Sequence, residues 1–137
     1  MKKAYSFLLV AASLLLASAA QAQDMHVRAN VPFDFTVGKT VLSAGTYDVT
    51  RLDLGSKVLM LRSENKSSMA IAHDCASALP STKTVLVFRE TPEGYALYQI
   101  WVQGDTTGRE FPQPKAQSRL AQNGKPAEVI IAANLVK

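Results

Sequence analysis

Eleven residues near the start of the chain alternate between apolar and polar side chains, and this alternation restricts the chain to a β fold. Every odd position from Val27 to Val37 is apolar, and the even positions between them are mostly polar. A period of two places the six apolar side chains on one face of an extended strand. We therefore expect an antiparallel sheet with one face on a core and the other in water.

Pro32 lies in the middle of this segment and limits how it can pair. Its nitrogen carries no hydrogen, so the side of the strand to which it points is unpaired. The segment is either an edge strand, or it bends at Pro32 and passes from one sheet to the other. Strands usually have about 5 to 6 residues, so the length of 27–37 favours the bend. Asp34 then lies on the wet face, where it keeps an exposed edge soluble.

Short apolar segments separated by turn residues fill the rest of the chain. The strongest hairpin joins 83–90 to 95–103 through Thr91-Pro92-Glu93-Gly94, and Gly38-Lys39 makes a second tight turn. Two glycines bound a connection at 104–108, and 114–123 is the one plausible helix. The pattern predicts an all-β fold, an antiparallel β-sandwich or small barrel of about seven to eight strands with one short C-terminal helix.

The first 22 residues have the features of a cleaved secretory signal peptide. Lys2 and Lys3 precede an apolar run over 7–17, and Ala20-Gln21-Ala22 supplies the small-x-small cleavage pattern. We therefore expect residues 23–137 to form a single β domain in the periplasm or the medium. No later segment approaches the roughly 20 apolar residues of a membrane span, so no membrane span is expected.

Composition argues against several classes of function. Loss of Lys2 and Lys3 with the signal reduces the 15 basic residues to 13, against 11 acidic ones, so nucleic acid is not an expected partner. Cys75 is the only cysteine, which excludes an internal disulfide and predicts either a buried thiol or a thiol that pairs between chains. The candidate metal ligands His26, His73 and Cys75 are scattered, so no metal site is predicted. No phosphate-binding or dinucleotide fingerprint is present, and no cofactor is expected.

His73 and Cys75 are the only pair with a possible nucleophilic role. Both lie on one face of a strand, whereas Asp74 between them points to the other face and cannot orient the histidine. We expect no catalytic dyad, and no enzyme.

The predicted ligand-binding residues are Tyr95, Gln99 and Trp101. Alternation along 95–103 places these three on one face with Leu97, which gives two aromatic plates beside an amide. Such a platform could stack a sugar or a flat apolar ligand. In the alternative interpretation, Phe111 and the apolar face of the 114–123 helix cover it.

Several motifs resemble one group of proteins. They are Val31-Pro32-Phe33-Asp34-Phe35-Thr36-Val37-Gly38, Ala44-Gly45-Thr46-Tyr47, Val58-Leu59-Met60-Leu61-Arg62-Ser63, Ile100-Trp101 and Gly108-Arg109-Glu110. Together they look like those of small exported bacterial proteins of unknown function, and the likeness spans most of 23–137. It implies kinship, and it brings no activity or binding residues. Ser43 stands where such proteins typically have proline, which weakens only the turn.

These observations lead to one main hypothesis and two alternatives. The main hypothesis is an exported, non-catalytic binding or structural module of the cell envelope, with an unknown protein or an envelope glycan as partner. The first alternative is a small barrel that carries an apolar ligand between strands that are apolar on both faces. The second is a small hydrolase, which would need a buried cluster of titratable groups in a cleft.

Overall fold

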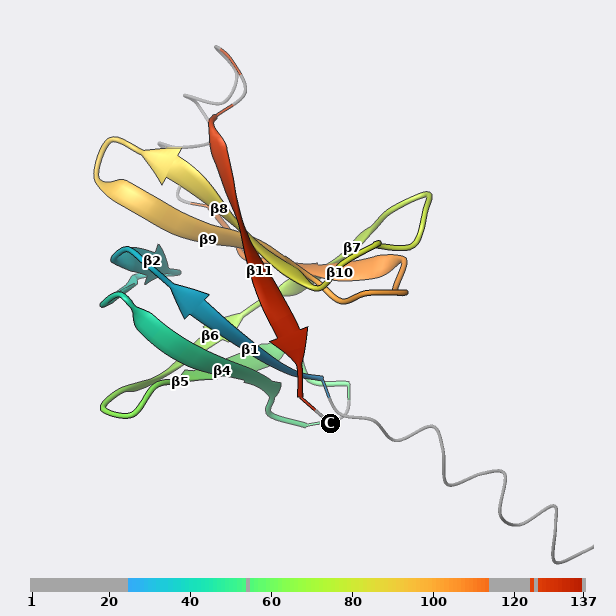
Figure 1. The fold of residues 1–137 in the computed structure, drawn as a ribbon, viewed down its shortest axis with the longest axis horizontal. Helices are drawn as coiled ribbons and strands as arrows, with labels where there is room; N and C mark the ends of the chain where they lie inside the picture. The colour runs from blue at the N-terminus through green and yellow to red at the C-terminus, as the bar shows by residue number, and fades with distance from the viewer. Residues whose placement is uncertain (1–24, 54, 114–123, 125, 137) are drawn as a thin grey trace, which may run out of the picture.

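The protein has an all-β fold, as the sequence predicts. A computed structural model describes residues 25–53, 55–113, 124 and 126–136, and this part of the chain contains 11 strands and no helix (Figure 1). The helix expected at 114–123 lies outside the described residues. In chain order the strands are β1 (His26–Val31), β2 (Phe35–Val37), β3 (Thr40–Leu42), β4 (Gly45–Arg51), β5 (Val58–Arg62), β6 (Ser67–Ile71), β7 (His73–Ala76), β8 (Val85–Thr91), β9 (Gly94–Trp101), β10 (Thr107–Glu110) and β11 (Glu128–Leu135).

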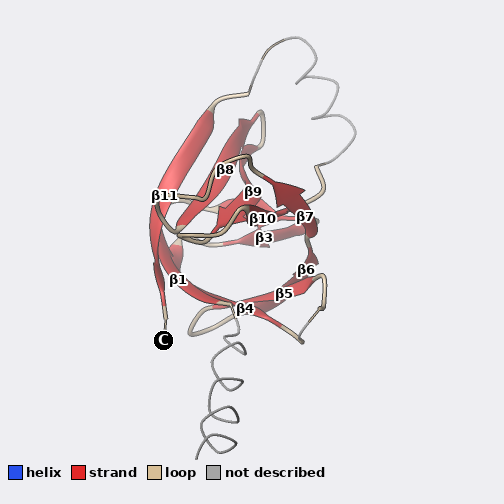
Figure 2. Cartoon of the chain, turned by 90° about the vertical axis from the view of Figure 1, so that its right-hand side faces the viewer, coloured by secondary structure: helices blue, strands red, loops and turns tan. Residues whose placement is uncertain are grey.

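Nine strands follow one another in the order β3-β2-β9-β8-β11-β1-β4-β5-β6 and curl into a nearly closed barrel (Figure 2). We call β1, β4, β5 and β6 half-sheet A, and β2, β3, β7, β8, β9 and β10 half-sheet B. The strand β11 joins them, since it pairs with β8 through 128–132 and with β1 through 133–135. Pairing is antiparallel except between β2 and β9, which run parallel. The sheet is thus a mixed barrel, with one parallel pair in a fold that was expected to be an antiparallel sandwich or small barrel.

The bend expected at Pro32 is confirmed. The strand β1 ends at Val31 after pairing with β4 and β11, and β2 begins at Phe35 and pairs with β3 and β9. Pro32 therefore lies where the chain leaves half-sheet A for half-sheet B. Its missing N–H removes a donor at a point where no ladder needs one.

A second bend at Ala72 carries the chain between the half-sheets on the opposite side of the barrel. The strand β6 pairs with β5, and after Ala72 the chain continues as β7, which pairs with β10. Ala72 is fully buried, and its N–H donates to the carbonyl of Lys57 at 2.8 Å. Only a small side chain fits such a buried bend.

Two differences explain why the structure has more strands than expected. A bend at Ala72 divides the apolar segment 69–75 between β6 and β7, and the expected connection at 104–108 runs into a strand, β10. Gly108 in β10 packs against Trp101, so this glycine makes a close contact within the sheet and does not mark a mobile link.

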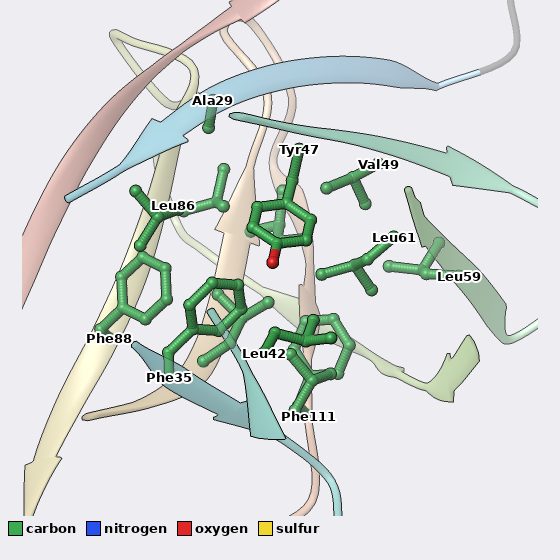
Figure 3. Close-up of a cluster of buried hydrophobic side chains, with 14 of the residues drawn as sticks. Ala29, Phe35, Leu42, Tyr47, Val49, Leu59, Leu61, Leu86, Phe88 and Phe111 are labelled. Carbon is green, nitrogen blue, oxygen red and sulfur yellow. The ribbon is translucent and has the colours of Figure 1, made fainter. Parts of the chain in front are cut away.

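The core fills the space between the half-sheets. Phe35 makes two aromatic contacts in this core. Its ring lies edge-on to the ring of Tyr47, with centroids 5.2 Å apart, and to the ring of Phe88, with centroids 5.3 Å apart (Figure 3). Edge-to-face contacts of this kind stabilise beyond the area that they bury. The other fully buried large side chains come from both half-sheets, and they include Leu42, Leu59, Leu61, Leu86, Leu97, Ile100 and Phe111.

The Asp34 carboxylate fixes the corner between β1 and β4. Asp34 is exposed, as predicted, and its Oδ1 accepts a hydrogen bond from the Ala44 N–H at 2.8 Å. The Tyr47 hydroxyl donates to the Ser43 carbonyl at 2.6 Å in the same corner. Asp34 was expected to keep an exposed sheet edge soluble, and this role is wrong. Asp34 lies in the connection between β1 and β2, and its hydrogen bond ties this connection to Ala44.

Substitution of Asp34 tests this corner. Asp34→Ala should lower the free energy of unfolding by about 1 kcal/mol, because the Ala44 N–H loses its acceptor. Asp34→Asn keeps an acceptor and should cost less. Urea denaturation measures both, with Glu93→Ala in the exposed β8–β9 turn as the control. Equal stability of the Asp34→Ala and Glu93→Ala proteins would contradict the assignment.

Candidate functional site

A β-bulge at Tyr98 divides the face on which Tyr95, Gln99 and Trp101 were expected to lie together. The register of β9 against β8 runs Phe88 to Leu97 and then Val87 to Gln99, so Tyr98 is the additional residue. Leu97 and Ile100 are both buried in the core, although strict alternation would place them on opposite faces. The bulge therefore puts Tyr95 on the inner face and Gln99 and Trp101 on the outer face of half-sheet B.

Tyr95 belongs to the edge of the core. Its ring lies against Phe33 with centroids 4.1 Å apart and planes at 32°, and Phe33 in turn meets Phe88 edge-on at 5.1 Å. The predicted three-residue platform is therefore not one surface. Whether these side chains bind a ligand stays a prediction.

Gln99 and Trp101 are linked on the outer face. The Trp101 Nε1–H donates to Gln99 Oε1 at 3.1 Å, and the Gln99 amide donates to Glu110 Oε2 at 3.1 Å. The Trp101 ring also rests on Gly108, where an added Cβ would lie 2.8 Å from two ring carbons. The amide that was expected to meet a ligand is thus engaged by two neighbours.

The expectation that Phe111 covers the face of Gln99 and Trp101 is wrong. Phe111 is buried in the core on the inner side of half-sheet B (Figure 3). The helix that was expected to help it, 114–123, lies outside the described residues.

Tyr98 and Arg89 continue the polar outer face. The Arg89 guanidinium lies 3.4 Å from the centre of the Tyr98 ring, and its Nε is 3.7 Å from a Glu128 carboxylate oxygen. Burial raises the pKa of the Tyr98 hydroxyl, and the positive charge of Arg89 opposes this shift. The phenol is therefore a neutral hydrogen-bonding group and not a base at neutral pH.

His73 and Cys75 share the outer face, and Asp74 points to the other side, as the sequence predicts. Asp74 forms an ion pair there with Arg109 from the neighbouring β10. Burial and the nearby charge of Glu110 both raise the pKa of the Cys75 thiol. A cysteine nucleophile needs the opposite shift, so this thiol is a poor candidate for catalysis.

The three candidate metal ligands fall on different half-sheets. His26 begins β1 in half-sheet A, with its Nε2 3.4 Å from Asp48, whereas His73 and Cys75 lie on β7 in half-sheet B. Among the described residues, no group of three or more histidines, cysteines and carboxylates could hold a metal ion.

A cavity of about 440 Å³ opens at one end of the barrel, where β1 begins and β4, β9 and β11 end. We call it the barrel-end cavity. Two arginines, Arg51 from the end of β4 and Arg109 from β10, contribute charge to its wall. The described residues that line it are Met25, Arg51, Ile100, Val102, Gln103, Asp105, Thr107, Arg109, Leu135 and Val136.

Sequence reasoning missed this cavity, although one signal was present. Tyr47, Val49 and Arg51 lie on one face of β4, and the first two are buried in the core. Arg51 therefore occupies an inward position that the pattern reserves for an apolar residue. Such a break in a binary pattern is typical of a functional position.

A second hollow of about 400 Å³ is formed by the loops that carry the Asp34 corner. Its wall combines 43–47 with the β5–β6 turn at 63–66. This hollow contains one lysine and one glutamate, Lys66 and Glu64, and both are exposed. It lacks buried polar groups that would fix a ligand, so the barrel-end cavity is the stronger candidate.

The contact between Gly108 and Trp101 gives a direct test of the outer face. Gly108→Ala should destabilise the protein by about 1 to 3 kcal/mol, because the new Cβ overlaps the indole ring. The same change in a Trp101→Leu background should cost much less, since the ring is gone. Thermal or urea unfolding of the four proteins completes a double-mutant cycle. Additive effects would contradict the contact.

The raised pKa of Cys75 predicts slow alkylation. At pH 7.5 the thiol should react with iodoacetamide several times more slowly in the folded protein than in urea, because less thiolate is present. Glu110→Gln should accelerate the folded reaction, since it removes a negative charge while burial remains. Equal rates in the folded and unfolded chains would contradict this environment.

No helix within the described part of the chain has the length and apolar character needed to cross a membrane. Comparisons of the chain with protein-family models, with curated proteins and with solved structures found no match. The geometry of the barrel-end cavity is therefore the basis on which a function can be proposed.

Proposed function

We propose that this chain is an exported, non-catalytic binding protein of the cell envelope, and that it holds a small ligand in the barrel-end cavity. The observation that carries the proposal is the cavity itself. Its volume of about 440 Å³ lies within the range of roughly 300 to 1,000 Å³ that small-molecule sites occupy. The mouth of a β-barrel is also a common place for such a site.

The composition of the wall supports binding. Apolar side chains such as Val102 and Leu135 stand beside a few polar groups, among them Gln103 and Thr107. Ligand sites typically combine an apolar wall with a small number of polar groups that fix orientation.

Two features favour binding over catalysis. The titratable groups that burial perturbs on the outer face, Cys75 and Tyr98, both have a raised pKa, and neither lines the barrel-end cavity. The charged groups that do line it include two arginines, which retain their protons and serve better as binding groups than as acids or bases.

The alternative of an apolar carrier with a ligand inside the barrel receives less support. Side chains from both half-sheets meet in the interior, among them Phe35, Phe88 and Leu61 (Figure 3). A carrier barrel keeps this space open for its ligand.

A blocked cavity tests the proposal. Thr107→Phe places a large ring in the cavity wall, whereas Thr106→Phe makes the same change at a neighbouring exposed residue that does not line it. Wild-type protein and the Thr106→Phe variant should be stabilised thermally by small-molecule extract of the periplasm, and Thr107→Phe should not. Native mass spectrometry should then detect the bound compound on the first two proteins alone.

Two results would contradict the proposal. One is that no fraction of the extract stabilises the wild-type protein. The other is that Thr107→Phe binds as the wild type does, which would place the ligand elsewhere on the barrel.

A further inference from the structure

Arg51 faces the barrel-end cavity with a buried nitrogen that has no partner. Its Nε is buried and makes no hydrogen bond, and Arg51 forms no ion pair among the described residues. Two other buried nitrogens without a hydrogen bond, on His26 and Arg89, each lie within 4.0 Å of a carboxylate. Among the residues that the structure describes, Arg51 thus has no acid paired with it, and an unsatisfied buried donor costs free energy.

Arg109 brings a second positive charge to the same cavity. Its side chain is 18% exposed, while its partner Asp74 is 62% exposed, so solvent screens much of the attraction between them. Burial lowers the pKa of the Arg109 guanidinium, and the charge of Arg51 lowers it further. Both arginines line the same cavity, so their positive charges repel each other.

The one acid among the described residues of the cavity wall does little to balance these charges. Asp105 lines the cavity, but it is exposed on the loop between β9 and β10. The cavity therefore has two partly buried cations, one exposed carboxylate in the wall, and the exposed Asp74 behind Arg109. An anion placed between the guanidiniums would satisfy their donors and remove their repulsion.

Most of the remaining wall is apolar, with Gln103 and Thr107 as its uncharged polar residues. Half of the lining residues are Met25, Ile100, Val102, Leu135 and Val136. A ligand that fits such a wall buries a hydrocarbon body as well as its charge. A bare inorganic ion would leave this surface in contact with water.

We infer that the barrel-end cavity binds a small soluble organic anion, with one carboxylate or phosphate group held between Arg51 and Arg109 and a short apolar body against the apolar side chains of the wall. This inference rests on the binding function proposed above, and it adds the chemical class of the ligand. Carboxylates and phosphates both match the paired donors of a guanidinium.

Four probes separate the charge from the apolar body. Calorimetric titration of the full, exported protein should detect octanoate and octyl phosphate, whereas octanamide, which has the same chain without the charge, should bind at least about tenfold more weakly. Inorganic phosphate, which has the charge without the chain, should also bind at least about tenfold more weakly than octyl phosphate.

Arg51→Gln tests the unpartnered cation, with Arg62→Gln as the matched control on the exposed end of β5. Arg51→Gln should weaken octanoate binding about 10- to 100-fold, which is the usual loss for a hydrogen bond to a charged group. Arg62→Gln should leave the affinity unchanged. The ligand-free Arg51→Gln protein should melt at the same temperature as the wild type or higher, because it no longer holds two repelling cations. This second measurement separates lost binding from lost folding.

Several outcomes would overturn the inference. Equal binding of octanamide and octanoate, or no effect of Arg51→Gln, would leave a cavity that takes neutral ligands, and the proposed function would stand. Equal binding of inorganic and octyl phosphate would remove the apolar body from the ligand. Sedimentation with phosphatidylglycerol vesicles that Arg51→Gln abolishes would replace the soluble ligand with a lipid head group. Failure of all four probes would overturn the ligand class, whereas the Thr107→Phe comparison decides separately whether the cavity binds anything.

Discussion

The barrel depends on three chain segments that leave one half-sheet and pair with the other. The chain crosses between the half-sheets after Val31 and again at Ala72, and β11 pairs with both half-sheets along its own length. Two separate sheets would have four exposed edges, whereas among the described strands this barrel has edges at β3, β6 and β7. The crossings also hold the half-sheets apart at a distance that core side chains can fill (Figure 2). The position of every residue in the barrel-end cavity follows from this closure.

The sequence predicted the parts of the fold that depend on local chemistry. Alternation over 27–37, the proline at 32 and the turn at 91–94 each have a local physical cause, and the structure has a strand, a bend and a hairpin at these places. The errors came from non-local contacts. Gly108 suggested a loop because the Trp101 ring that packs on it is contributed by another strand. Parallel pairing of β2 with β9 depends on how the chain crosses at Pro32, which no local pattern records.

The same distinction applies to the site. Strict alternation grouped Tyr95 with Gln99 and Trp101, and a single inserted residue at Tyr98 was enough to separate them. A bulge is defined by how two strands pair, so the alternation along β9 alone does not reveal it. The barrel-end cavity is harder still to predict, because its wall combines Met25, just before β1, and the end of β11 with residues from β4, β9 and β10.

Arg51 is the position where stability and function conflict most clearly. On the inward face of β4 it follows Tyr47 and Val49, and its partner across the strands is the buried Leu59. A leucine or methionine there would extend the core and would remove a charge that repels Arg109. The guanidinium instead lies at the point where the core ends and the cavity begins. An anion in the cavity would turn this unfavourable arrangement into a favourable one, because a desolvated charge contributes most when its counter-charge is also shielded from water. The free energy that Arg51 costs the protein would then be recovered when an anion binds. This would give the cavity a selectivity for charged ligands that the apolar wall alone does not supply.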